Sequence, residues 1–274
     1  MLDLEDTELL EYHQLKSIGG LSLLRYLGLR GTGVTKLPKQ IMALEHLNTL
    51  DLRRTMVTQL PAFQTVKLAS LLVDRLQLHR GMGEMRYLEE LSMIFVSPIR
   101  PIESLSKIHV HDTDSLDNLV QLINKSKQLR ILAVRFDGLL GDTKTYRQVG
   151  VRHFLEEVAK SSIQSLILHN YPHNSVDLLV DCWVCTSLKK FELKIDGQIS
   201  NIPQKMASLE NLTHLHINVY KADAEGLYGL GKLPNLVFLN LTSEFGTQER
   251  CIITRDYFLC LKIFSYLRAV WGTA

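Results

Sequence analysis

Residues 21–29 read Leu-Ser-Leu-Leu-Arg-Tyr-Leu-Gly-Leu, and their pattern, L-x-x-L-x-x-L-x-L, decides the fold. The pattern recurs in phase over residues 44–52, 209–217 and 233–241. Chance matches in a leucine-rich helical protein would not easily keep this order four times. The sequence therefore predicts an internal repeat, which accounts for much of the excess of leucine, 50 of 274 residues.

Less regular copies fill the rest of the chain, each marked by two apolar residues two positions apart. Counted from Leu2 there are eleven copies, and residues 258–266 follow the pattern as a twelfth candidate. The copies are about 24 residues apart on average, within the period of roughly 20–29 residues that leucine-rich repeats have. The first apolar residues of the eleven copies, here called anchors, are Leu2, Leu27, Leu50, Leu71, Leu91, Ile108, Leu132, Leu166, Phe191, Leu215 and Leu239.

The end of each copy has a period of two, which predicts a short β-strand with its two apolar residues on one side. A single repeat cannot close its own core, so neighbouring copies must stack. Pro38 and Pro61 exclude a long regular helix in the first two return segments. We therefore expect an α/β leucine-rich-repeat solenoid, with a curved parallel sheet on the concave face and irregular turns and short helices on the convex face.

Two irregular steps of the repeat predict helices. The long step between Leu132 and Leu166 indicates an insertion near residues 138–160, with a helix over residues 146–160. Apolar spacing predicts a second helix over residues 114–125. We expect residues 1–274 to form a single leucine-rich-repeat domain. Because the first strand has no capping segment before it, we also expect a further domain upstream of this chain.

Composition excludes several classes of protein. A net charge of +2, with 46% hydrophobic and 22% charged residues, argues against wholesale disorder and gives no reason to expect a nucleic acid or membrane partner. The N-terminus is acidic, unlike a signal peptide, and no apolar run approaches the roughly 20 residues that span a bilayer. These features predict a cytoplasmic protein.

The sequence contains only weak matches to motifs of catalytic, metal-binding and phosphate-binding sites. Cys182-x-x-Cys185 lacks the second pair that a zinc site needs and the setting of a redox site, which favours buried reduced thiols. His109-x-His111 lacks further metal ligands. The glycines of residues 28–33 sit in a strand and its turn, without the Gly-Lys-Ser/Thr of a phosphate loop. We expect no enzyme activity, no metal and no cofactor.

The outward positions of the predicted strands remain as a surface for a protein partner. The first three full copies carry five arginines against two aspartates, which favours an acidic partner. If Arg53 and Arg54 only face solvent, replacing both by Glu should weaken that contact and leave the melting temperature nearly unchanged. The candidate partner-binding residues of the concave face are Arg25, Arg30, Arg53, Arg54, Arg75, His109, His111, Arg130, Arg135, Lys189, His214 and His216.

Residues 24–41 and 47–61 share the element L-x-x-T-x-V-x-x-L-P and resemble the repeats of plant nucleotide-binding leucine-rich-repeat disease resistance proteins, especially those of cereals. Residues 85–93 and 233–241 resemble later repeats of such arrays. The resemblance implies an intracellular immune receptor whose repeats hold a nucleotide-binding domain inactive and take part in pathogen recognition. The implied partner is a nucleotide-binding domain, in cis or in trans, or a pathogen effector. The nucleotide-binding domain itself is absent from this chain, so nucleotide binding is not carried over.

Other classes of function stay open as alternatives. The first is a stand-alone adaptor, such as the substrate-recruiting subunit of a ubiquitin ligase, which would need an upstream segment that contacts the ligase. An extracellular ligand-binding repeat protein would need a signal peptide and cysteine caps. An enzyme would rest on Cys182 and Cys185 alone.

Overall fold

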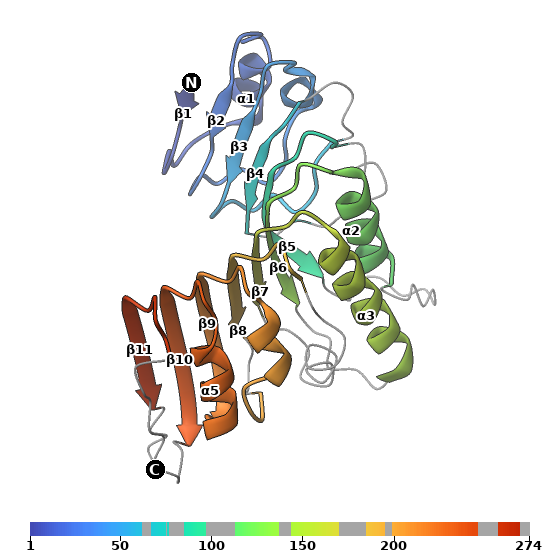
Figure 1. The fold of residues 1–274 in the computed structure, drawn as a ribbon. Helices are drawn as coiled ribbons and strands as arrows, with labels where there is room; N and C mark the ends of the chain where they lie inside the picture. Colours follow the sequence, from blue (N-terminus) through green and yellow to red (C-terminus); the bar gives the residue numbers. More distant parts are fainter. Residues whose placement is uncertain are drawn as a thin grey trace, which may run out of the picture. The chain divides into compact units, whose positions relative to one another are not determined.

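A computed structural model describes most of the chain. The described residues are 1–61, 67–74, 76, 85–96, 113–136, 144–169, 185–194, 199–245 and 257–268. The chain divides into two compact units, Met1–Gly141 and Asp142–Ala274, and each is described by itself. Figure 1 shows their strands and helices.

The first unit is a parallel sheet whose six strands follow one another in sequence order. Its strands are β1 (Leu2–Asp3), β2 (Tyr26–Gly28), β3 (Thr49–Leu52), β4 (Ser70–Val73), β5 (Glu90–Val96) and β6 (Ile131–Phe136). Its helices are α1 (Tyr12–Ile18), the 3-10 helix η1 (Lys39–Ala43) and α2 (Thr113–Lys125).

The second unit repeats this arrangement with five parallel strands, again in sequence order. They are β7 (Ser165–His169), β8 (Lys190–Lys194), β9 (His214–Lys221), β10 (Phe238–Phe245) and β11 (Ile263–Arg268). Its helices are α3 (Lys144–Lys160), the 3-10 helix η4 (Gln204–Ser208) and α5 (Ala224–Gly231).

The anchors of neighbouring strands lie side by side in both units, as the repeat predicts. In the first unit the paired series is Leu2, Leu27, Leu50, Leu71, Leu91 and Leu132. In the second unit it is Leu166, Phe191, Leu215, Leu239 and Phe264. Apart from Leu2 and Phe264, on the first and last strands of the chain, these side chains are fully buried. The predicted parallel sheet with apolar residues on one side is confirmed.

The strand predicted at Ile108 does not fit this sheet. Leu91 pairs directly with Leu132, so the described part of the sheet has no strand between β5 and β6. Ile108 itself lies outside the described residues. The twelfth candidate, residues 258–266, does supply a strand, because Phe264 of β11 pairs with Leu239. The spacing rule failed where a helix, α2, lengthens one step of the repeat.

Both predicted helices are present, at nearly the predicted bounds. Leu119 and Ile123 of α2 are buried, as are Phe154 and Val158 of α3. Their spacing of four residues places each pair on one side of its helix. The apolar side of each helix therefore joins the core of its unit.

The element L-x-x-T-x-V-x-x-L-P forms the turn from a strand into its return segment. The buried Thr32 and Thr55 hydroxyls each donate a hydrogen bond of 2.7 Å, to the Leu29 and Leu52 carbonyls respectively. Pro38 then precedes η1, and Pro203 stands in the same place before η4. Proline suits this place because it has no N–H to leave unpaired at a helix start.

Asparagine side chains join successive repeats of the second unit. Asn211 Nδ2 donates to the Thr186 carbonyl at 2.7 Å, and Asn235 Nδ2 donates to the Glu210 carbonyl at 2.9 Å. Both asparagines occupy the third place of an L-x-N-L segment. Each gives a loop carbonyl of the preceding repeat a hydrogen-bond donor.

We predict that Leu50→Ala or Leu215→Ala lowers the free energy of unfolding by about 2–5 kcal/mol, because each leaves a cavity in a closed core. Urea unfolding followed by circular dichroism measures the change. Leu23→Ala is the matched control, because Leu23 is 79% exposed and its truncation should change stability by less than about 0.5 kcal/mol. Equal effects of the buried and exposed substitutions would contradict the assigned core.

Candidate functional site

The candidate surface is the outward face of the strands, opposite the buried anchors. Side chains alternate along a strand, so residues one before and one after an anchor point outward. Because the strands are in register, outward residues of neighbouring strands form columns within each unit. We call these side chains, with those directly flanking the strands, the outward face.

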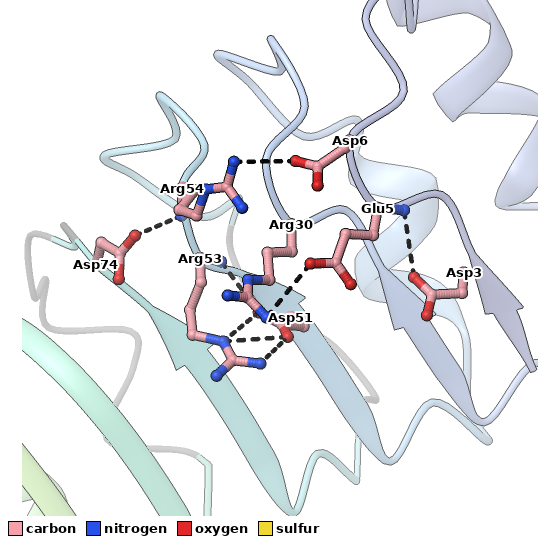
Figure 2. Close-up of polar contacts among 8 residues, drawn as sticks. All are labelled: Asp3, Glu5, Asp6, Arg30, Asp51, Arg53, Arg54 and Asp74. Atoms are coloured by element: carbon pink, nitrogen blue, oxygen red, sulfur yellow. Dashed lines mark hydrogen bonds and ion pairs between the residues drawn. The ribbon is translucent and has the colours of Figure 1, made fainter.

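Asp51 and Arg53 form the central ion pair of this face in the first unit (Figure 2). Asp51 is only 2% exposed. Its carboxylate accepts hydrogen bonds from Arg53 Nε, at 2.9 and 3.1 Å, and from the Arg53 backbone N–H at 3.1 Å. The hydrogen bond to Asp51 is the main cause that raises the pKa of Arg53. Arg53 therefore holds a buried carboxylate in addition to presenting charge to solvent.

Two further arginines form ion pairs with carboxylates of the loop that follows β1. Arg30 Nη1 lies 3.3 Å from Glu5 Oε1, and Arg54 Nη2 lies 3.1 Å from Asp6 Oδ1 (Figure 2). Arg54 reaches across Gly31, where a Cβ would collide with the Asp6 carboxylate. Gly31 has φ of 70°, a conformation that glycine adopts without strain.

A last carboxylate closes this network. Asp74 Oδ2 accepts a hydrogen bond from the Arg54 backbone N–H (Figure 2). Five carboxylates and three guanidinium groups thus share this part of the face; the carboxylates are Asp3, Glu5, Asp6, Asp51 and Asp74, and the arginines are Arg30, Arg53 and Arg54. These three arginines do not form an unopposed basic surface, because acidic side chains of the loop after β1, of β3 and directly after β4 pair with them.

Tyr26 lies beside the same network. Gly28 has no side chain, and a Cβ there would meet the Asp3 carboxylate and the Tyr26 hydroxyl. Burial raises the pKa of Tyr26, and the negative charges of Asp3 and Asp51 raise it further. The phenol is therefore a neutral hydrogen-bonding group at neutral pH.

The remaining candidates of the first unit are scattered. Arg25 is exposed at the start of β2. Arg130 is half-buried and donates from Nη1 to the Lys127 carbonyl at 3.4 Å, and Arg135 is half-buried on β6. The other three candidates, Arg75, His109 and His111, lie outside the described residues.

The candidates of the second unit lie together on β8 and β9. Lys189 and His214 are exposed and His216 is half-buried. Glu192 of β8 lies beside His216 of β9, with its carboxylate 3.8 Å from both Lys190 Nζ and His216 Nδ1. The His214 ring stacks on Phe238 with ring centroids 5.7 Å apart. The structure therefore brings these three predicted residues together and adds Lys190, Glu192 and Phe238.

The acidic residues of the network could have been found in the sequence. Asp51 and Arg53 are two positions apart on one strand, so they share a face. The step of 25 residues from Leu2 to Leu27 places Glu5 beside Arg30. The charge count included Asp51 and Asp74 but left out Asp3, Glu5 and Asp6, because it began with the first full copy.

The described residues include two of the four cysteines, in different surroundings. Cys185 is buried, with its Sγ 3.3 Å from Ser187 Oγ, whereas Cys260 is exposed; Cys182 and Cys251 lie outside the described residues. Within the described ranges no three His, Cys, Asp or Glu side chains gather to hold a metal ion. No helix in the same ranges has the length and apolar character needed to cross a membrane.

The Asp51–Arg53 pair yields a prediction about stability. Arg53→Ala should lower the free energy of unfolding by about 1–3 kcal/mol, because it removes the side-chain donors of a buried acceptor. Arg53→Glu combined with Arg54→Glu should lower the melting temperature further, which reverses the expectation from sequence. Arg25→Ala is the control and should change stability by less than about 0.5 kcal/mol. Differential scanning calorimetry distinguishes these results, and an unchanged melting temperature for Arg53→Ala would show that the pair is not structural.

Comparison with known proteins gives a consistent result. The family described as "Leucine-rich repeat region" matches residues 1–273. Disease resistance protein RGA4 of Oryza sativa subsp. japonica is 27% identical over 271 residues, which cover 96% of this chain and 25% of the relative. Disease resistance protein Pik-2 of the same plant is 24% identical over 273 residues, which cover 91% of this chain and 26% of the relative. The chain spans about a quarter of the length of these curated relatives.

Among solved structures, the leucine-rich-repeat protein LIC12759 of Leptospira interrogans has a similar fold. Its TM-score is 0.56 at 19% identity, over 96% of this chain and 59% of that chain. This likeness concerns the fold alone. Together with the in-register strands and the family match over nearly all residues, it shows that the chain belongs to the leucine-rich repeat region family.

Proposed function

We propose that this chain is a non-catalytic protein-interaction module of a cytoplasmic plant immune receptor. Its relatives are disease resistance proteins, and the family is a scaffold for protein interaction. Its repeats would contribute to the defence response by contacting a nucleotide-binding domain, in cis or in trans, or a pathogen effector.

The outward face is the observation that carries this proposal. Each strand adds outward side chains to columns that the neighbouring strands continue, while the anchors underneath are closed to solvent. The backbone of a sheet built in this way is held by its core, so outward side chains can vary without loss of the fold. Because the backbone of this face is already ordered, binding of a partner protein costs little conformational entropy.

A binding experiment with a relative's domain tests this function. The purified chain is titrated with the purified nucleotide-binding domain of rice RGA4, in the presence of ADP, by biolayer interferometry. We expect saturable binding that weakens at least tenfold when bulky charge is placed on the outward face. Suitable double variants are Thr49→Arg with Ser70→Arg, paired on β3 and β4, and Asn218→Arg with Thr242→Arg, paired on β9 and β10.

Thr35→Arg with Thr58→Arg is the matched control, because both threonines are exposed on return segments of the first unit. It adds the same charge away from the outward face and should change the affinity less than twofold. Absence of binding, or equal weakening by the control, would contradict the proposed role of the outward face.

A further inference from the structure

The two residues that lead into each strand differ in charge between the two units. In both units the first of the two donates its backbone N–H to the equivalent residue of the preceding strand, so the positions match. In the first unit, from β2 to β6, these positions hold two arginines and two glutamates, which balance; the charged residues are Arg25, Glu89, Glu90 and Arg130. In the second unit, from β8 to β11, they hold three lysines and no carboxylate; the lysines are Lys189, Lys190 and Lys262.

These lysines lie among apolar and aromatic side chains that are exposed or half-buried. Lys190 of β8, His214 of β9, Phe238 of β10 and Ile263 of β11 form one column in continuous register. Ile263 is 55% exposed, and the Phe238 ring is stacked on His214. We call the six residues Lys189, Lys190, His214, Phe238, Lys262 and Ile263 the β8–β11 strip.

The charge of the strip is only partly neutralised from within the second unit. Among the described residues, Glu192 in the next outward column pairs with the strip, with its carboxylate 3.8 Å from Lys190 Nζ and its side chain only 13% exposed. Lys190 keeps 46% of its side chain exposed, and Lys189 and Lys262 are exposed at the flanks. In the first unit, by contrast, three arginines of the outward face are already held by carboxylates.

We propose that the β8–β11 strip binds an acidic segment of a partner protein that also carries an aromatic or branched aliphatic side chain. The carboxylates of the segment pair with Lys189, Lys190 and Lys262, and its apolar side chain packs against Phe238 and Ile263. The charge complementarity selects the partner's acidic side chains, and the apolar contact adds affinity that salt does not screen. This inference rests on the proposed function and names the class of segment that the module recognises.

The size of the strip sets the length of the segment. Its column crosses four strands, and neighbouring strands lie about 4.8 Å apart, so the column is roughly 14 Å long. An extended chain rises about 3.3 Å per residue, so roughly four or five residues cover it. A short linear segment, from a loop or a disordered region, is sufficient.

Fluorescence anisotropy with a defined probe tests the proposal on the whole chain. The probe is a fluorescein-labelled peptide in which three Asp-Glu pairs alternate with one Phe and one Leu. We expect saturable binding in 50 mM salt that weakens in 150 mM salt but persists. A peptide with Lys in place of Asp and Glu should not bind, and a peptide with Ser in place of Phe and Leu should bind at least fivefold more weakly.

Variants of the chain locate the site. Lys189→Glu with Lys190→Glu should weaken binding at least tenfold, whereas Lys36→Glu with Lys39→Glu, an equal charge change on the first unit's return segment, should weaken it less than twofold. Ile263→Ser should weaken binding several-fold and, because Ile263 is exposed, should leave the circular dichroism spectrum unchanged. Equal effects of the two charge variants, an unchanged affinity of Ile263→Ser, or no binding in low salt would each overturn the proposal.

The two experiments distinguish failure of the β8–β11 strip from failure of the proposed function. If the acidic peptide does not bind but the nucleotide-binding domain does, the β8–β11 strip is wrong and the interaction module stands. If the peptide binds at the strip and the nucleotide-binding domain does not bind, the strip stands and that partner is wrong.

Discussion

Burial of one anchor from each repeat at the same level of the sheet is the interaction on which the rest of the structure depends. The described anchors from Leu27 to Leu239 are closed to solvent, each beside the anchor of a neighbouring strand. A strand that slipped by one residue would turn its anchors outward and its charged residues into the core. The anchors therefore fix which residues face outward as well as the stacking of repeats.

The fixed register gives the two units different surfaces from the same architecture. In the first unit it places Glu5 beside Arg30 and keeps Asp51 under Arg53, so much of the charge is used within the face. In the second unit, at the positions directly before the anchors, the register places Lys190 beside His214 and Phe238 beside Ile263, and most of the charge there stays accessible. A difference in partners then requires changes in outward residues only.

The sequence predicted the strands and the two long helices because local periods carry that information. Leu215 and Leu239 keep the pattern in full, and α2 and α3 show helical spacing. The sequence failed at Ile108, because an apolar pair alone does not show whether a strand joins the sheet, and the step from Leu91 to Ile108 is shorter than the period of the repeat. It also could not show the Asp6–Arg54 pair, because that pair joins side chains two strands apart across Gly31.

The candidate surface could be predicted as a face but not as a set of charges. The outward positions follow from the period of two, and Lys189, His214 and His216 do lie together. Whether an outward arginine is available for a partner depends on carboxylates from other strands, and Arg53 and Arg54 differ from Arg25 in this respect. Counting charges along single repeats misses these contacts, since they form between repeats.

The register is tested most directly by nuclear Overhauser effects between side chains of the selectively labelled protein. Our account predicts cross-peaks between the rings of His214 and Phe238 on the outward face, and between the methyl groups of Leu215 and Leu239 in the core. Cross-peaks from the His214 ring to the Leu239 methyl groups, without those to Phe238, would indicate a shift by one residue. That result would contradict the assigned outward face and the functions proposed for it.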